Sequence, residues 1–340
     1  MKSEPRGPGA MRALDAPTLP HDADLDVRIL RVMYASRGVS ISGIDPRFNA
    51  NRIARELGVS RATVAARLRG WADSGFVERY DVWPNPYLFE LTGATFDIRV
   101  ADRLAKDALI ARIGLVPGAV GGLDFVGEWM AVTFVLPRDA DPRRTAALLR
   151  GISGVAEVGE AVPWAPPESS RTLSPLELRI VRVLRRYPTE TLAQVARHVG
   201  VSTRTITSRY ARLIDEHAVW FVPTFDFRAM SDPVLSINLQ FESVADRASF
   251  GRALDRTFAR TLEFRRTAFG PALPDTFASY FVVLRSAARI DDVEAWTRAQ
   301  PGVVAEETLV MSRILSFPET FDQLIREVRG ASRAGDRAAR

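Results

Sequence analysis

The chain has 340 residues, 46% hydrophobic and 26% charged, which is enough for roughly two to four globular domains with real cores. It has no cysteine, which excludes disulfides, thiolate catalysis and cysteine metal sites, and no run of about 18 uncharged apolar residues that could cross a membrane. The formal net charge is +5, and the basic residues are arginines except for Lys2 and Lys106. Arginine binds phosphate and guanine, so the bias toward arginine suits a nucleic-acid-binding protein. A GC-rich genome, which favours arginine codons, explains the bias equally well. We expect a cytoplasmic protein without a membrane partner.

Residues 1–22 are rich in Pro, Gly, Ala and Arg and lack an apolar signal core, so they are predicted to form a disordered tail. A first helix follows, with Asp24 as its N-cap. Its apolar residues are Leu25, Ile29, Leu30, Val32 and Met33. The Gly/Pro/Asn-rich stretch 38–50 is predicted to be a surface loop, with a contact to DNA or to a partner as the alternative.

Residues 52–71 have the pattern of two short helices joined by a turn at Gly58, where a residue without Cβ easily adopts positive φ. Ser60 precedes the second helix as its N-cap. The inner faces of the helices carry Ile53, Ala54 and Leu57, then Val64, Leu68 and Trp71. The outer face of the second helix carries Arg61, Ala62, Thr63, Ala65, Ala66, Arg67 and Arg69. Small residues, hydroxyls and guanidiniums without a carboxylate suit the major groove, so a helix-turn-helix is predicted.

Residues 76–83 alternate well enough for a strand, which Pro84 and Pro86 end. In a winged helix, such a strand belongs to a hairpin beside the recognition helix, and Arg79 is then a candidate phosphate contact. The alternative is a strand that only closes the wing and leads into the next domain, which the high aromatic content favours. The first winged helix-turn-helix domain is predicted over residues 23–90.

Residues 91–163 have the predicted order β-α-β-β-α-β. The strands are expected over 94–100, 119–127, 129–136 and 155–162, and the helices over 102–114 and 141–152. This order is the ferredoxin-like motif, in which both helices cover one face of the sheet. The open apolar face needs a partner, so we expect intramolecular pairing with a second domain of the same kind.

The proline-rich segment 164–172 is predicted to be a linker, after which the pattern repeats. Residues 194–213 align without a gap on residues 52–71, an offset of 142 residues. The identical pairs are Ala54/Ala196, Arg55/Arg197, Gly58/Gly200, Val59/Val201, Ser60/Ser202, Thr63/Thr205 and Arg67/Arg209. The preceding helix, 175–186, aligns on the first helix at an offset of 151 residues, so the first unit has extra residues within 38–50.

The second unit is predicted to comprise a winged helix-turn-helix over 173–230 and a ferredoxin-like domain over 231–317. Its sheet domain has expected strands at 234–242, 262–269, 277–285 and 303–315, and helices at 246–257 and 290–299. Residues 318–340 are predicted to be a C-terminal helix and tail. The predicted fold class is therefore α+β, a tandem repeat of a winged helix-turn-helix and a βαββαβ sensor domain.

This arrangement resembles the Lrp/AsnC family of feast-or-famine transcription regulators. The resemblance rests on residues 54–86 and 196–227 and covers nearly all of 25–317, as two family units where typical members have one. It implies paired sensor domains, with effectors such as amino acids bound where they meet. Gly127, Glu128 and Trp129 match the family's turn of glycine, acidic residue and aromatic residue, which implies effector binding. The second unit has GPALPD, 270–275, in that place.

The leading hypothesis is a sequence-specific transcription regulator that binds double-stranded DNA, responds to an amino acid or other small metabolite, and forms a homodimer. The predicted DNA contacts are Ser60, Arg61, Thr63, Arg67 and Arg69, with Ser202, Thr203, Arg204, Thr205 and Arg209. The outer faces differ, as at Ala62 and Arg204, so an asymmetric operator is expected. No catalytic residue, metal or cofactor is predicted, and the protein is expected not to be an enzyme.

Two alternatives stay open. Siroheme decarboxylases use the same two-domain build, including fused forms, and Arg265-Arg266 followed by Phe269-Gly270 faintly resembles one of their arginine-rich strands. Against this alternative, none of the three histidines lies on a predicted sensor-domain strand. The other alternative is a ligand-sensing scaffold with one degenerate DNA-binding head, because Glu216 and His217 stand where the first unit has Ser74 and Gly75.

Overall fold

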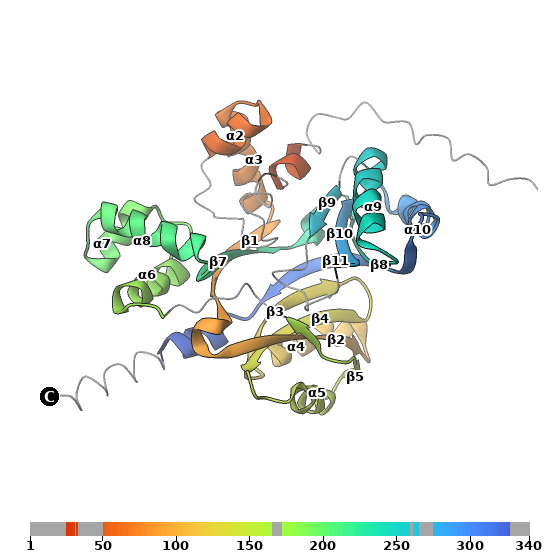
Figure 1. The fold of residues 1–340 in the computed structure, drawn as a ribbon, viewed down its shortest axis with the longest axis horizontal. Helices are drawn as coiled ribbons and strands as arrows, with labels where there is room; N and C mark the ends of the chain where they lie inside the picture. The colour runs from red at the N-terminus through yellow and green to blue at the C-terminus, as the bar shows by residue number, and fades with distance from the viewer. Residues whose placement is uncertain are drawn as a thin grey trace, which may run out of the picture.

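The computed structural model describes residues 25–30, 32, 50–164, 172–230, 232–258, 261–264 and 275–326. These form two groups of helices, a two-stranded ribbon and one large sheet with helices of its own (Figure 1). The predicted N-terminal tail, most of the 38–50 loop and of the linker, and the segment 265–274 lie outside the described residues. No helix within the described ranges is both long and apolar enough to cross a membrane.

The first group of helices forms where the first helix-turn-helix is predicted. It consists of the helical segment 25–30, α2 (Ala50–Leu57) and α3 (Arg61–Asp73). Gly58 joins α2 to α3 with a φ of +67°, which a residue without Cβ adopts without strain. Ser60 caps α3, because its Oγ accepts a hydrogen bond from the Thr63 amide at 3.0 Å.

The second group repeats these local features. It consists of α6 (Pro175–Arg186), α7 (Leu192–Val199) and α8 (Thr203–Asp215). Ser174 and Glu177 form a capping box at the start of α6. Gly200 ends α7 with a φ of +74°, and Ser202 caps α8 through the Thr205 amide at 3.1 Å.

The strands that follow α3 and α8 pair with each other. The antiparallel ribbon consists of β1 (Val77–Pro84) and β7 (Val219–Phe225), with Val77 opposite Phe225 and Pro84 opposite Val219. The pairing agrees with the favoured alternative, in which these strands do not form separate hairpins beside α3 and α8, because each strand has its partner in the other segment. Trp83, Trp220 and Phe221 are fully buried, and this ribbon is too apolar to stand in solvent as a wing.

A nine-stranded sheet forms the body of the molecule, in the order β5-β2-β4-β3-β11-β8-β10-β9, with β6 also paired to β2. The strands of its first half are β2 (Leu91–Val100), β3 (Ala119–Phe125), β4 (Trp129–Pro137), β5 (Val155–Val158) and β6 (Val162–Trp164). Those of its second half are β8 (Val234–Phe241), β9 (Thr261–Phe264), β10 (Phe277–Val283) and β11 (Val303–Ser316).

Four α-helices and four short 3-10 helices accompany the sheet among the described residues. The α-helices are α4 (Lys106–Gly114), α5 (Pro142–Arg150), α9 (Val244–Thr257) and α10 (Ile290–Arg298). The 3-10 helices are η1 (Pro86–Phe89), η2 (Arg103–Ala105), η3 (Phe227–Ala229) and η4 (Ala287–Arg289). Within each half, the strand and helix order is the predicted β-α-β-β-α-β, with the last strand of the first half split into β5 and β6.

The two halves join edge to edge through the long strand β11. Its first part pairs with β8, and Met311 to Ser316 pair with β3 of the other half. Two glycines of β3 allow close approach of the neighbouring strands. At the junction, a Cβ on Gly121 would lie 2.6 Å from the Leu315 carbonyl oxygen of β11, and within the first half a Cβ on Gly122 would lie 2.1 Å from the Ala131 carbonyl oxygen of β4. The two halves therefore meet through strand edges, whereas the sequence was expected to pair them through their open sheet faces.

The ribbon covers part of the sheet face that the helices leave open. Trp83 and Trp220 pack in one cluster with Val120 and Val135 of the first half. Phe225 belongs to a second cluster, which also contains Phe281 and Met311 of the second half and the inner residues of α2 and α3. Burying a large apolar side chain contributes about 1.5–3 kcal/mol, so these contacts fix the helical groups relative to the sheet.

Candidate nucleic-acid interface

The predicted DNA-binding residues divide into those that face solvent and those that face the protein. Ser60, Arg61, Thr63 and Arg69 of the first group are exposed, as are Ser202, Thr203 and Arg204 of the second, whereas Thr205 is half-buried. The cap serines also bond to hydroxyls: Ser60 Oγ lies 2.7 Å from Thr63 Oγ1, and Ser202 Oγ lies 2.9 Å from Thr205 Oγ1. The N-terminal turns of α3 and α8 therefore present hydroxyls and guanidiniums to solvent.

Arg67 and Arg209 turn toward the first helix of their own group. Arg67 Nε lies 3.2 Å from Asp26 Oδ1, and Arg209 Nη1 lies 3.4 Å from Glu177 Oε1. The Glu177 side chain is only 2% exposed, so the second pair has a buried carboxylate. Asp26 and Glu177 stand at the offset of 151 residues that relates the two first helices, so this signal was present in the sequence.

A second arginine contact also occurs in both groups. Arg28 donates to the Leu57 carbonyl oxygen at the end of α2 at 2.7 Å, and Arg179 donates to the Val199 carbonyl oxygen at the end of α7. A cation at a helix C-terminus satisfies a carbonyl that has no partner within the helix. These arginines therefore fix the turn that precedes each recognition helix.

Arg79, the candidate wing contact, is engaged within the protein. Its Nε lies 3.0 Å from Asp81 Oδ2, and its Nη2 donates to the Ser316 carbonyl oxygen at 3.0 Å. Arg79 thus ties the ribbon to the end of β11. We assign it no phosphate contact.

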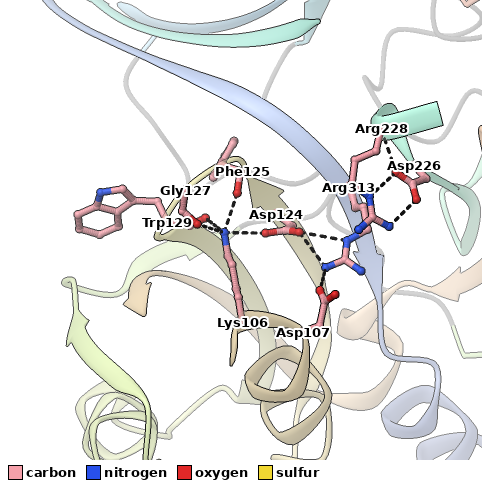
Figure 2. A network of polar contacts seen from close by, with 9 residues as sticks. All are labelled: Lys106, Asp107, Asp124, Phe125, Gly127, Trp129, Asp226, Arg228 and Arg313. Carbon is pink, nitrogen blue, oxygen red and sulfur yellow. Dashed lines mark hydrogen bonds and ion pairs between the residues drawn. The ribbon is translucent and has the colours of Figure 1, made fainter. Parts of the chain in front are cut away.

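The predicted effector turn, Gly127 to Trp129, is built around the buried ammonium of Lys106. Lys106 Nζ donates to the carbonyl oxygens of Phe125, Gly127 and Trp129 at 2.6, 3.1 and 2.6 Å, as Figure 2 shows. Gly127 has a φ of +97°, Glu128 is exposed, and Trp129 is half-buried. Three carbonyls therefore converge on one cation, and a buried cation is stable only when it is paired in this way.

The lysine belongs to an ion-pair network that reaches the other half of the sheet (Figure 2). Asp124 accepts Lys106 at 2.7 Å and, through its other oxygen, Arg313 of β11 at 2.9 Å. Arg313 also pairs with Asp107 at the start of α4. Burial lowers the pKa of Arg313, but its bonds to Asp124 and Asp107 more than compensate, so the net shift is upward.

A neighbouring pair completes this region. Arg228 of η3 bonds to both carboxylate oxygens of Asp226, at 2.8 and 2.5 Å. The hydrogen bond from Arg228 lowers the pKa of Asp226, and the same bond raises the pKa of Arg228. Asp226 also forms a β-bridge with Arg313, so the network links the ribbon, β11 and the effector turn.

The remaining predicted features concern the histidines and the acidic residues. The described residues contain no cluster of three or more His, Asp or Glu side chains that could hold a metal. His198 pairs with Glu190 at 2.8 Å and stacks on Tyr187, and His217 has a φ of +51° after α8. Arg265, Arg266 and the segment 270–274 lie outside the described residues.

Comparison with known proteins assigns the second group of helices. Residues 173–219 match the family model described as winged helix-turn-helix DNA-binding. The chain contains a winged helix-turn-helix DNA-binding domain. No curated protein matches the sequence.

Several solved structures resemble the fold. The siroheme decarboxylase NirDL is 13% identical with a TM-score of 0.48, over 91% of this chain and 99% of that chain. AsnC of E. coli is 15% identical with a TM-score of 0.28, over 45% of this chain and 97% of its own. A member of the AsnC family from Pyrococcus furiosus is 13% identical with a TM-score of 0.28, over 44% and 92%. Likenesses of this size support no residue role or activity.

The expectation that the protein is not an enzyme has to be corrected. A structure that covers nine-tenths of this chain belongs to an enzyme, the siroheme decarboxylase, so this fold does not exclude catalysis. The expectation rested on the absence of histidines from the predicted sensor strands. The absence of histidines from these strands argues only against catalysis by a histidine there. It does not exclude catalysis by other residues of the sheet domain.

Proposed function

We propose that the protein is a sequence-specific transcription regulator whose two recognition helices, α3 and α8, both enter DNA. The observation that carries this proposal is the exposed N-terminal turn of α8, with Thr203 and Arg204, inside the segment that matches a winged helix-turn-helix DNA-binding family. Hydroxyls and guanidiniums at the start of such a helix reach base edges and phosphates.

We further propose that the two groups of helices are copies of one unit. The arginine that caps the preceding helix occurs in both groups, as Arg28 and Arg179. The ion pair between the recognition helix and the first helix also occurs in both, through Arg67 and Arg209. Equivalent contacts at fixed sequence offsets favour duplication over chance.

In this proposal the DNA contacts come from the predicted residues that are exposed, together with the half-buried Thr205. They are Ser60, Arg61, Thr63 and Arg69 on the first head, and Ser202, Thr203, Arg204 and Thr205 on the second. In the DNA-free protein, Arg67 and Arg209 hold their helices in place. The Gly127 to Trp129 turn, supported by Lys106, is the proposed effector-responsive element of the sheet domain.

Selection of genomic fragments by the purified full chain at two salt concentrations tests the proposal. The wild type should enrich a defined sequence, and the double variant Arg61→Ala plus Arg204→Ala should lower the salt slope by about 1.8, which is about 0.9 for each phosphate that the variant no longer binds. Arg144→Ala is the matched control, because Arg144 is an exposed arginine on α5 of the sheet. Enrichment of no sequence, or an equally reduced slope in the control, would refute the proposal.

A further inference from the structure

The C-terminal segment, residues 317–326, bridges the sheet and the second group of helices. It leaves β11 and is helical from residue 319 to residue 326. On the sheet side, the Phe317 amide donates to the Val120 carbonyl oxygen at 3.0 Å, and Thr320 Oγ1 donates to the Ala119 carbonyl oxygen at 2.8 Å. On the other side, Ile325 is 3% exposed and belongs to the core of the second group. The segment is therefore packed between two parts of the molecule.

Arg185, in the last turn of α6, joins this segment to the second group and to the ribbon. Its Nε and Nη2 lie 2.9 and 2.7 Å from Asp322 Oδ1, and Nη2 also donates to the Pro318 carbonyl oxygen at 2.8 Å. Its Nη1 donates to the Val82 carbonyl oxygen of β1, and its guanidinium lies 5.7 Å from the centroid of the Phe321 ring. The Arg185 side chain is 6% exposed, and a buried cation is stable only when its donors are paired. One guanidinium thus holds α6, β1 and the C-terminal segment together.

The connection that follows β1 holds the second group from another side. Leu88 and Phe89 of η1 pack against the core of the second group. Asn85 caps η1 through the Tyr87 amide, and its Nδ2 donates at 3.0 Å to the carbonyl oxygen of His217, in the turn after α8. The second group is therefore fixed at both ends of its bundle, by η1 beside α8 and by Arg185 on α6.

The first group of helices is attached differently. The connection from β7 to β8 lies across a cavity of about 310 Å³ from α3, and the lining includes Gly70 and Met230. At the offset of 142 residues, Met230 aligns with Leu88, which packs against the second group. At the offset of 151 residues, Arg185 aligns with Tyr34, which carries no guanidinium. The bonds that Arg185 makes are therefore a feature of the second group.

The ribbon makes the orientation of each group important, because the two groups lie at its opposite ends. α3 leads into β1 at Val77, and α8 leads into β7 at Val219, which pairs with Pro84 at the far end of β1. The eight residues of β1 separate these ends by about 23 Å, at about 3.3 Å per residue. Rotation of one group about its end of the ribbon changes both the distance and the angle between α3 and α8. Contacts that prevent this rotation therefore determine which spacing of two half-sites the helices can reach.

We propose that Arg185 is a positioning residue of the DNA interface. By bonding to the C-terminal segment and to the Val82 carbonyl oxygen, it fixes the orientation of α8 relative to α3 and thereby selects one spacing between two half-sites. Arg185 acts from within the protein, because its side chain is 6% exposed and its donors point to protein oxygens. The fixed orientation stands on these contacts alone, whereas the selection of spacing rests on the proposed regulator function.

Distances between spin labels on the full chain without DNA test the fixed orientation. The chain has no cysteine, so introduced cysteines label only the chosen positions. Ala193→Cys on α7 with Ala147→Cys on α5 reports on the second group, and Ala72→Cys on α3 with Ala147→Cys reports on the first; all three positions are exposed. We expect Arg185→Ala to broaden the distance distribution of the second group by about twofold, and to leave that of the first group unchanged.

Two further variants control this measurement. Arg186→Ala is the matched control, because Arg186 is the next arginine in the same turn, is exposed, and lies over Tyr187. It should leave both distributions unchanged. Asp322→Asn keeps the two carbonyl acceptors of Arg185 and should broaden the distribution of the second group less, and it decides the test if circular dichroism shows that Arg185→Ala is unfolded. Wild-type distributions in these two variants, or equal broadening for both groups, would overturn the fixed orientation.

The selection of spacing is measured separately on the selected operator. Two base pairs inserted between the half-sites rotate one half-site by about 70° relative to the other. The wild type should lose about tenfold or more in affinity for this duplex, and Arg185→Ala about threefold or less, because its second group can follow the displaced half-site.

A duplex with only the half-site of the second group separates positioning from damage to this group. Arg185→Ala should bind it within about twofold of the wild type, since the variant keeps the exposed face of α8. A large loss on this duplex, or the same penalty for the insertion in both proteins, would overturn the selection of spacing. If the wild type binds no DNA, the regulator function fails, and the spin-label distances still decide the orientation.

Discussion

Replacing Arg209 by alanine tests whether this arginine belongs to the protein's own framework or to the DNA interface. In the DNA-free structure, Arg209 lies 3.4 Å from Glu177, whose side chain is 2% exposed. Glu177 keeps two hydrogen bonds from Ser174, at 2.9 and 2.7 Å, when Arg209 is removed. The variant therefore keeps the capping bonds of a buried carboxylate and removes its ion pair with Arg209.

The expected loss of stability follows from the exposure of the two partners. A pair exposed on both sides contributes about 0.2–1 kcal/mol, whereas breaking a fully buried pair costs about 3–5 kcal/mol. Arg209 is 38% exposed and Glu177 is buried, so this pair lies between these limits. We expect Arg209→Ala to lower the free energy of unfolding by about 1–2 kcal/mol, and less than that in a Glu177→Gln background.

Two measurements on Arg209→Ala and Arg204→Ala make the test decisive. Urea unfolding should show a lower midpoint with an unchanged slope for Arg209→Ala, and a change within about 0.5 kcal/mol for the exposed Arg204→Ala. DNA binding should show the reverse: the salt slope falls by about 0.9 for Arg204→Ala and stays constant for Arg209→Ala. A wild-type midpoint together with a reduced salt slope for Arg209→Ala would refute a structural role.

Three further perturbations probe the sheet. Lys106→Met removes the donor to three carbonyl oxygens and one of the two cations that pair with the buried Asp124, which keeps Arg313; it should destabilise the protein by about 1–3 kcal/mol in urea unfolding, and a wild-type midpoint would contradict the network. The pKa of Asp226 is lowered, so its stabilisation is present above its unfolded pKa and is lost as the pH falls through its folded pKa; unfolding midpoints of Asp226→Asn and wild type should converge as the pH falls below about 4. Gly122→Ala places a Cβ against the Ala131 carbonyl oxygen and should cost about 1–3 kcal/mol or more, and a wild-type midpoint would contradict the close approach of β3 to β4.

Local patterns in the sequence predict the elements well, because local physics determines them. Ser60 and Ser202 cap the recognition helices as expected, since a serine hydroxyl satisfies an amide within three residues. Alternation along 234–242 predicts the strand that forms as β8. The Gly58 turn also follows from a single residue type. These features need no knowledge of distant partners.

Partners across the chain were harder to predict. The outer face of α3 makes Arg67 a natural DNA contact, but its partner Asp26 lies 41 positions before it, beyond a loop that helical periodicity does not span. Likewise, nothing local pairs β1 with β7, or divides β11 between two neighbours. Lys106 did carry a signal, since it is one of two lysines in a chain of arginines. A compact ammonium fits among three carbonyls, where a planar guanidinium does not.

In the proposed function one chain carries both DNA-binding heads, which removes a constraint that governs symmetric dimers. A symmetric dimer of identical chains presents identical recognition surfaces and therefore reads palindromic sites. Here the aligned positions differ: Ala62 aligns with Arg204, and Ala66 aligns with Ser208. Each proposed head can therefore prefer its own half-site. We expect the selected operator to be asymmetric. Palindromes built from either half should bind more weakly, by about 1–3 kcal/mol for each mismatched base pair, in titrations at fixed salt. Equal affinity for both palindromes and the natural site would show that the heads read the same sequence, and the difference between Ala62 and Arg204 would then carry no specificity.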